Sequence, residues 1–194
     1  MPDFRLAPEH LFPAAVEDVL SAYRWLADQR RRIVLAGDSA GAALACSLLV
    51  TLKARALPMP AGVVCLCPGF DLTGAPEFTT GDPEAVTVMR RAAGAYLAGH
   101  PADDPVVSPL AADFTGMPPL LVQAGTGDFA LPQARALADH AARHGVDARL
   151  ELYPADTHVF QVFWSFLPEA ADALQQAGSF ICEVMAGERA ESRA

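Results

Sequence analysis

The sequence has few cysteines, few basic residues and no long apolar run, and each shortage excludes a class of protein. Its four cysteines are too few and too unevenly spaced for a disulfide scaffold, so we expect small buried side chains at all four and no metal site. Acidic residues (23) outnumber basic ones (14), and the net charge of −9 argues against nucleic acid or an anionic membrane as partner. No apolar run approaches the ~20 residues that span a bilayer, and the N-terminus lacks the basic start and apolar stretch of a secretory signal. A cytoplasmic protein without a membrane span is therefore expected.

What the chain does contain is an alternation of apolar strands and amphipathic helices. Hydrophobic residues make up 52% of the 194 residues and charged residues 19%, which suits one domain with a sizeable core. Strands are predicted over the apolar runs 33–36, 62–67, 120–124 and 148–153. Helices are predicted over 13–29, from Ala42 to the prolines at 58 and 60, over 84–97, from 134 to Gly145, and over 170–184, with a fraying tail from Gly187. Apolar strands alternating with helices predict an α/β fold in three layers, with a mostly parallel sheet covered on both faces.

The run Gly37-Asp38-Ser39-Ala40-Gly41 joins the first predicted strand to the next helix. It matches G-x-S-x-G in the strand–turn–helix context where that motif marks a nucleophilic serine. Such a turn holds Ser39 in a strained backbone conformation that exposes its hydroxyl, and the N–H of Ala40 at the helix start is the expected oxyanion-hole donor. Glycine is expected at both Gly37 and Gly41 because a Cβ there would collide with the neighbouring elements. A chance match to the motif in a chain rich in alanine and glycine is the competing interpretation.

A serine hydroxyl needs a base to take its proton and a carboxylate to orient that base. His158 follows the fourth predicted strand in a loop, whereas His140 and His144 lie on a predicted helix, so His158 is the candidate base. Asp128 directly follows the third strand and is the candidate acid, while Asp156 is too near His158 in sequence for the usual geometry. The alternative for Asp128 is a plain helix N-cap. The order serine, acid, histidine is that of α/β-hydrolases.

Several stretches resemble the hormone-sensitive-lipase-like family of bacterial esterases within the α/β-hydrolases. They are F-R-L-A-P-E-H from Phe4, D-L-T from Asp71, V-S-P-L from Val107, P-P-L-L-V-Q-A-G from Pro118 and Y-P-A-D-T-H-V-F from Tyr153. The resemblance implies a triad of Ser39, Asp128 and His158, no cofactor, and substrate-pocket elements at about 75–105 in a domain that covers 1–194. Many members carry D-P-L at the acid, where this chain has Asp128-Phe129-Ala130-Leu131. That departure is interpreted as subfamily variation, closest to members that hydrolyse lactones or short-chain esters.

The larger departure from the family lies ahead of Ser39. Family members carry an H-G-G-G loop upstream of the R-L-A-P-E-H stretch, and its glycine N–H groups supply the rest of the oxyanion hole. In this sequence no glycine precedes Gly37. The resemblance therefore predicts an N-terminally truncated domain of about four parallel strands, in which the strand 33–36 forms an unprotected apolar edge.

The function expected from these residues is hydrolysis of a small ester or lactone of short to medium chain length through an acyl-enzyme on Ser39. An inactive remnant of the fold, or a module that only binds, is the alternative. A serine peptidase on the same fold is less favoured, because no propeller or large cap that would select peptides is evident in the sequence. Assembly into a homo-oligomer is left open.

Overall fold

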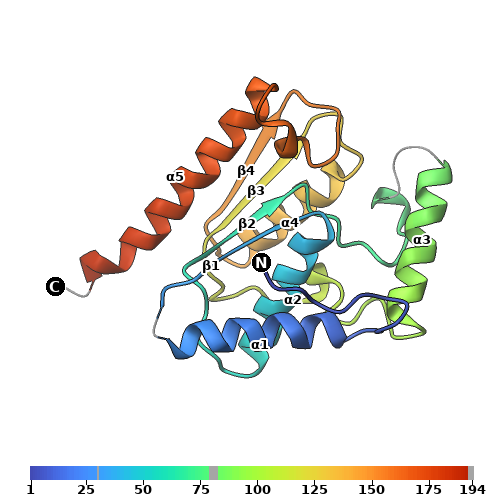
Figure 1. The fold of residues 1–194 in the computed structure, drawn as a ribbon, viewed down its shortest axis with the longest axis horizontal. Helices are drawn as coiled ribbons and strands as arrows, with labels where there is room; N and C mark the ends of the chain where they lie inside the picture. Colours follow the sequence, from blue (N-terminus) through green and yellow to red (C-terminus); the bar gives the residue numbers. More distant parts are fainter. Residues whose placement is uncertain (30, 79–82, 192–194) are drawn as a thin grey trace.

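A single sheet of four parallel strands forms the centre of the described chain (Figure 1). The computed structural model describes residues 1–29, 31–78 and 83–191. The strands are β1 Val34–Asp38, β2 Gly62–Leu66, β3 Leu120–Gly125 and β4 Ala148–Tyr153. Their spatial order is β1-β2-β3-β4, and the register pairs Ala36 with Val64 and Leu121 with Arg149. Because all four strands run parallel, their carboxyl ends meet at one edge of the sheet, which confirms the predicted α/β fold.

Helices cover both faces of the sheet. The helices are α1 Ala14–Asp28, α2 Ala40–Ala54, α3 Pro83–Leu97, α4 Leu131–Arg143 and α5 Pro168–Glu191. Short 3₁₀ helices within the described residues are η1 Pro76–Phe78, η2 Pro109–Ala111 and η3 Phe160–Phe163. Helices α2 and α4 pack on one face, α5 packs on the other, and α1 packs against the outer side of α2 (Figure 1). The predicted three layers are therefore present.

The alternation of side chains along each strand feeds two apolar cores. Val63 and Val122 pack with the inner faces of α2 and α4, whereas Val64 and Leu121 pack against Phe180 of α5. All of these strand side chains are almost fully buried. Burying one such side chain contributes roughly 1.5–3 kcal/mol relative to leaving it exposed. Apolar packing on both faces therefore stabilises the sheet, and the loops at its carboxyl edge start from well-packed strands.

Several element boundaries and one buried position differ from the prediction. Strand β1 continues to Asp38 and α2 already begins at Ala40, so the turn between them is shorter than predicted. Helix α5 continues through Gly187 to Glu191, where fraying was expected. Cys182 is exposed, so the expectation that all four cysteines are buried was wrong. Its position falls off the stripe of α5 that faces the sheet through Phe180.

In the region predicted to contribute to the substrate pocket, about 75–105, the described residues form η1, α3 and the turns that follow it, and residues 79–82 lie outside the described part. Helix α3 stands to one side of the sheet and lies against the N-terminal segment (Figure 1). The backbone N–H of Phe12 donates to the carbonyl of Tyr96 over 2.9 Å, and the two rings meet edge to face with centroids 5.8 Å apart. Near the sheet, Phe78 of η1 contacts Phe70. The role of this region in substrate binding stays a prediction.

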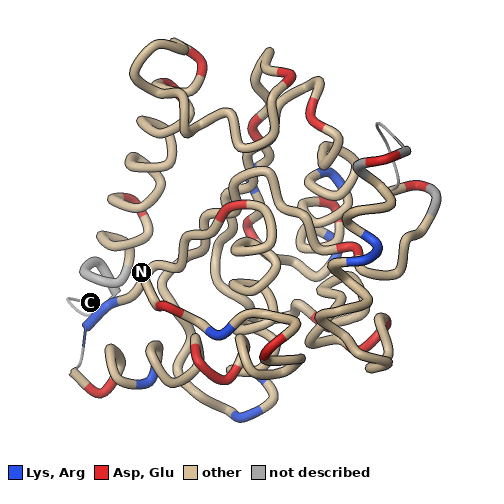
Figure 2. Tube along the Cα trace, turned by 45° about the vertical axis from the view of Figure 1, so that its right-hand side comes forward, with Lys and Arg blue, Asp and Glu red and all other residues tan. Residues whose placement is uncertain are grey.

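Acidic positions are scattered along the described trace, and basic ones occur singly or in short runs between them (Figure 2). The net charge of −9 is thus spread over the molecule. None of the described helices is both long and apolar enough to cross a membrane.

Candidate active site

Ser39 is the single residue between β1 and α2. Its backbone has φ 49° and ψ −118°, outside the regions that side-chain-bearing residues normally occupy. The Ser39 N–H donates to the carbonyl of Leu66 over 2.9 Å, and its carbonyl accepts from the N–H groups of Ala42 (3.1 Å), Ala43 (3.3 Å) and Gly69 (3.2 Å). Such strain costs about 1–3 kcal/mol and persists because the surroundings fix it. The strained turn expected from the sequence is therefore present.

The two glycines of the motif turn out to have different roles. A Cβ at Gly37 would collide with the backbone carbonyl of Gly41 and would come within 2.7 Å of the Ala42 nitrogen. A Cβ at Gly41 would meet only the Asp38 Oδ1 atom, at 3.9 Å. The collision predicted for Gly41 was therefore wrong, because the helix turns this position away from the strand.

Gly37→Ala is expected to lower the free energy of unfolding by about 3 kcal/mol. The new methyl group would collide with backbone atoms of Gly41 and Ala42, which cannot move aside as a flexible side chain could. Gly41→Ala is the matched control, and is expected to be neutral or to stabilise by up to ~1 kcal/mol as an unstrained helical alanine. Urea unfolding followed by circular dichroism measures both. Equal midpoints for Gly37→Ala and Gly41→Ala would contradict the assignment of the close approach to Gly37.

The structure brings Ser39, His158 and Asp128 into one hydrogen-bonded chain. The Nε2 atom of His158 lies 2.8 Å from Ser39 Oγ. Its Nδ1 atom lies 2.9 Å and 3.0 Å from the two carboxylate oxygens of Asp128. With Asp128 ionised, Nδ1–H donates to the carboxylate, which leaves Nε2 free to accept the Ser39 hydroxyl. Each group follows a different strand, β1, β4 or β3, at the shared carboxyl edge.

Asp128 is buried at the base of this chain, with a fully covered side chain, whereas the imidazole of His158 is 23% exposed. Burial opposes ionisation of Asp128, but hydrogen bonds from His158 and the Ala130 N–H, together with the nearby Cys67 thiol, outweigh it, and the pKa of Asp128 lies below its ordinary value. The carboxylate is thus ionised at neutral pH. Helix α4 begins at Leu131 with Ala130 as its N-cap, so Asp128 precedes the helix and is not a plain N-cap.

The other candidates lie apart from Ser39. His140 is buried on α4 and its Nε2 hydrogen-bonds the carbonyl of Ala112 over 2.8 Å. Asp156 packs on the acid loop instead, where a Cβ at Gly127 would collide with its Oδ1 atom. The interpretation of Asp156 as unsuited to orient His158 therefore agrees with its position.

Two further features surround the serine. Ala40 is the first residue of α2, where backbone N–H groups have no helical partner and the helix dipole is positive. Gly69 lies beside the hydroxyl, since a Cβ there would be 3.5 Å from Ser39 Oγ. The loop of Gly69 is held by Gln133 of α4, whose Oε1 accepts the N–H groups of Phe70 (2.7 Å) and Asp71 (2.8 Å).

Sequence reasoning passed over Cys67 and Gln161, which lie next to the acid and the base. Cys67 follows the carboxyl end of β2 and was interpreted only as a small buried side chain. The predicted strand 62–67 included Cys67, whereas β2 ends at Leu66, so the sequence did not place this residue among those that follow a strand.

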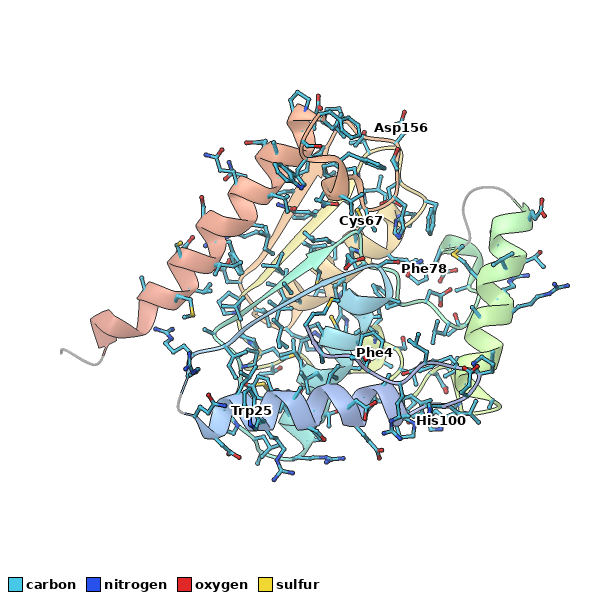
Figure 3. All side chains as sticks on the ribbon, viewed as in Figure 1. Phe4, Trp25, Cys67, Phe78, His100 and Asp156 are labelled. Carbon is cyan, nitrogen blue, oxygen red and sulfur yellow. The ribbon has the colours of Figure 1, made fainter. Side chains whose placement is uncertain are left out.

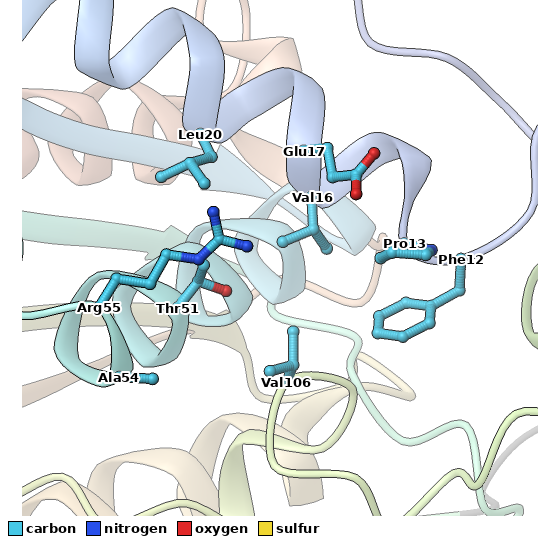
Figure 4. Close-up of a pocket in the computed structure, with 9 residues that line it drawn as sticks. All are labelled: Phe12, Pro13, Val16, Glu17, Leu20, Thr51, Ala54, Arg55 and Val106. Atoms are coloured by element: carbon cyan, nitrogen blue, oxygen red, sulfur yellow. The ribbon is translucent and has the colours of Figure 1, made fainter.

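A pocket of about 250 Å³ lies between α1 and α2 (Figure 4). It is lined by Phe12, Pro13, Val16, Glu17, Leu20, Thr51, Ala54, Arg55 and Val106. None of the three hydrogen-bonded residues lines this pocket, so it is separate from the candidate active site.

A serine on a strand–turn–helix elbow, with an imidazole and a carboxylate past later strands of one parallel sheet, defines the α/β-hydrolase class. The chain belongs to that family, because the family model described as alpha/beta hydrolase fold matches residues 1–162.

Curated relatives and solved structures agree with this assignment. An acetyl-hydrolase of Streptomyces hygroscopicus is 41% identical over 186 residues, which cover 92% of this chain and 62% of the relative. An esterase of Acinetobacter venetianus is 34% identical, with the same two shares covered. A solved esterase from the bacterial hormone-sensitive lipase family is 43% identical with a TM-score of 0.83, over 92% of this chain and 63% of that one. The predicted resemblance to this family is therefore confirmed, and the chain spans less than two thirds of these relatives' length.

Proposed function

We propose that this chain carries the nucleophile, base and acid of a serine carboxylic-ester hydrolase. The observation that supports it best is the unbroken hydrogen-bonded chain from Ser39 Oγ through His158 to the ionised Asp128. In this arrangement Ser39 is the nucleophile, His158 the general base and acid, and Asp128 the group that fixes the imidazole tautomer. The mechanism needs no cofactor, since each proton moves between side chains, substrate and water.

In the acylation half-reaction, Ser39 Oγ attacks the ester carbonyl carbon while its proton passes to His158 Nε2. The carbonyl oxygen becomes an oxyanion, and the positive charge on the imidazole is balanced by Asp128. Collapse of the tetrahedral intermediate breaks the bond to the alcohol oxygen, which takes the proton from Nε2 and leaves. The acyl group then remains on Ser39 as an ester.

The deacylation half-reaction repeats these steps with water. His158 Nε2 takes a proton from the water as its oxygen attacks the acyl carbon. The second intermediate collapses by breaking the bond to Ser39 Oγ, which regains its proton from Nε2. The carboxylic acid leaves, and the residues return to their starting protonation states.

Ala40 is the proposed donor for the oxyanion. Its N–H lies at the first position of α2, directly after the nucleophile, so the helix dipole also favours negative charge there. A donor of this kind contributes about 10²–10³ in kcat in serine hydrolases.

Small neutral esters or lactones with short to medium acyl groups are the proposed substrates. Gly69 leaves space next to Ser39 Oγ, and the aromatic ring of Phe129 lies against His158 with centroids 4.4 Å apart. The relatives named an acetyl-hydrolase and an ethyl acetate hydrolase, the latter 31% identical and from Pseudomonas putida, act on small acyl groups by those names. Free space beside the nucleophile and an aromatic ring beside the base suit the acyl or alcohol part of an uncharged ester.

The proposal is tested by assaying the 194-residue chain with p-nitrophenyl acetate and butyrate, followed by labelling with a fluorophosphonate. We expect release of p-nitrophenol, one phosphonyl group per chain by intact mass, and its location on Ser39 by peptide mapping. Replacement of Ser39 by alanine should abolish both the labelling and the turnover. Binding of an ester without cleavage or labelling would favour the alternative of a module that only binds.

A further inference from the structure

Cys67 lies at the carboxyl edge of the sheet, directly after β2 (Figure 3). Its backbone φ is 45°, in the left-handed region that side-chain-bearing residues rarely adopt. The turn separates its side chain from that of Cys65. Cys65 packs in the core under α2 and α4, whereas Cys67 packs with Tyr153 and Phe160 near the start of α5. The strained backbone thus directs a fully buried thiol toward the loops that follow β3 and β4.

The Cys67 thiol reaches both the acid and the loop of the base. Its Sγ atom donates to Oε1 of Gln161 over 3.6 Å, and the same thiol lies beside the Asp128 carboxylate. Sγ, a carboxylate oxygen of Asp128 and a ring nitrogen of His158 all lie within 4.8 Å of one another. Gln161 belongs to η3 and follows His158 by three residues. A single S–H therefore has acceptors on both loops that bring the acid and the base together.

A buried amide behind Cys67 determines which way Gln161 faces. Gln123 of β3 donates Nε2–H to Glu151 Oε2 over 2.9 Å and to the carbonyl of Ala173 over 2.8 Å. Its own Oε1 is then left to accept from Nε2 of Gln161 at 3.4 Å. Gln161 must therefore present Oε1 to Cys67, where the buried oxygen needs a donor and the thiol is within reach.

We propose that Cys67 is a positioning residue, whose thiol holds Asp128 in line with His158 by linking the acid to Gln161 of the histidine loop. This inference rests on the proposed ester hydrolysis. An alkyl side chain in place of the thiol would leave the buried Oε1 of Gln161 without its donor and would remove the polar S–H from beside the Asp128 carboxylate. The thiol also withdraws negative charge from the Asp128 carboxylate, so it sets how strongly that group accepts Nδ1–H of His158.

Cys67→Ala and Cys67→Ser form the test pair, because only serine keeps a donor and both place a small side chain on the same backbone. Cys67→Ala is expected to lower kcat about tenfold with KM unchanged, because the acid and the histidine loop lose the polar group that lies between them. With more charge left on Asp128, the protonated imidazole is favoured, and the acid limb of kcat/KM moves to higher pH. Cys67→Ser is expected to restore both quantities to near wild type. Cys46→Ala removes another fully buried thiol, on α2, and is expected to leave kcat unchanged.

The charged and titratable groups near His158 are the other groups that could shift the acid limb of the kcat/KM profile. Asp128 and Cys67 are its neighbours in the cluster, and Asp156 lies on its own loop against Gly127. Glu151 lies behind Gln123, beyond the amide chain. Asp128, Asp156 and Glu151 are the same in Cys67→Ala and Cys67→Ser, so the two variants differ only in whether residue 67 carries a donor.

A second readout does not depend on turnover. In the resting protein, the NMR signal of the Nδ1–H proton of His158 is expected to move downfield in Cys67→Ala and to return in Cys67→Ser. Gln161→Met frees the thiol to donate to Asp128 alone, so the signal is expected to move upfield, and this variant serves if Cys67→Ala does not fold.

An unmoved proton signal, or a serine variant that behaves like the alanine variant, would overturn the positioning role of Cys67. Absence of ester turnover by wild-type protein would instead count against the proposed function. The two failures are thereby distinguished.

Discussion

Ser39→Ala is expected to lower kcat for p-nitrophenyl butyrate by about 10⁶, because loss of the serine of a triad removes the covalent pathway entirely. The loss falls on kcat, since the hydroxyl contributes little to ester binding before attack. Steady-state release of p-nitrophenol measures the loss. The variant must be purified free of other esterases, because a trace of contaminating activity would hide a loss of this size. Alanine fits the same backbone as serine, so the fold is expected to remain intact.

Ser47→Ala is the matched control for this variant. Ser47 lies on the same helix, α2, and its hydroxyl donates only to the Ala43 carbonyl over 3.1 Å among the bonds described for it. The chemical change is identical, but it is remote from His158. Ser47→Ala should therefore keep wild-type kcat and accept one phosphonyl label. Retained turnover in Ser39→Ala would remove Ser39 from its proposed role.

The positions of the candidate residues at the sheet edge follow from the sequence to a large degree. Apolar runs with β-branched residues locate the strands, and parallel strands must place their carboxyl ends together. That geometric rule drew attention to Ser39, Asp128 and His158, each in a loop that follows a strand. The rule did not select Cys67, because the predicted strand 62–67 included this residue and a buried thiol is by default a small hydrophobic side chain.

The features that sequence could not provide depend on distances across the fold. Nothing local distinguishes Gly37, which a backbone carbonyl approaches, from Gly41, which has room for a methyl group. The direction of the Cys67 side chain depends on a positive φ that no cysteine requires by itself. The partner of Gln161 is set by Gln123, 38 residues away, whose own acceptors come from β4 and α5.

Asp128→Asn is expected to lower kcat by about 10⁴ with little change in KM. An amide at this position can donate to His158 Nδ1, which favours the tautomer that carries its proton on Nε2. That tautomer cannot accept the Ser39 hydroxyl proton, and the amide no longer balances the charge of the protonated imidazole. Asp139→Asn is the matched control, because Asp139 is exposed on α4 and undergoes the same change away from the site. Comparable losses in the two variants would contradict the proposed role of Asp128.

Asp128→Asn is also expected to change how the free energy of unfolding depends on pH. This measurement reports the structural effect of the carboxylate separately from its catalytic effect. The pKa of Asp128 is lower in the folded protein than its ordinary value, so folding favours the ionised form. This stabilisation is present above the ordinary pKa of a carboxyl group and is lost as the pH falls through the lower folded value. The stability difference between wild type and Asp128→Asn should therefore be constant near neutral pH and shrink in acid. Urea unfolding of both proteins across the acidic range measures it, and a difference that grows toward low pH would contradict the hydrogen-bonded, ionised state of Asp128.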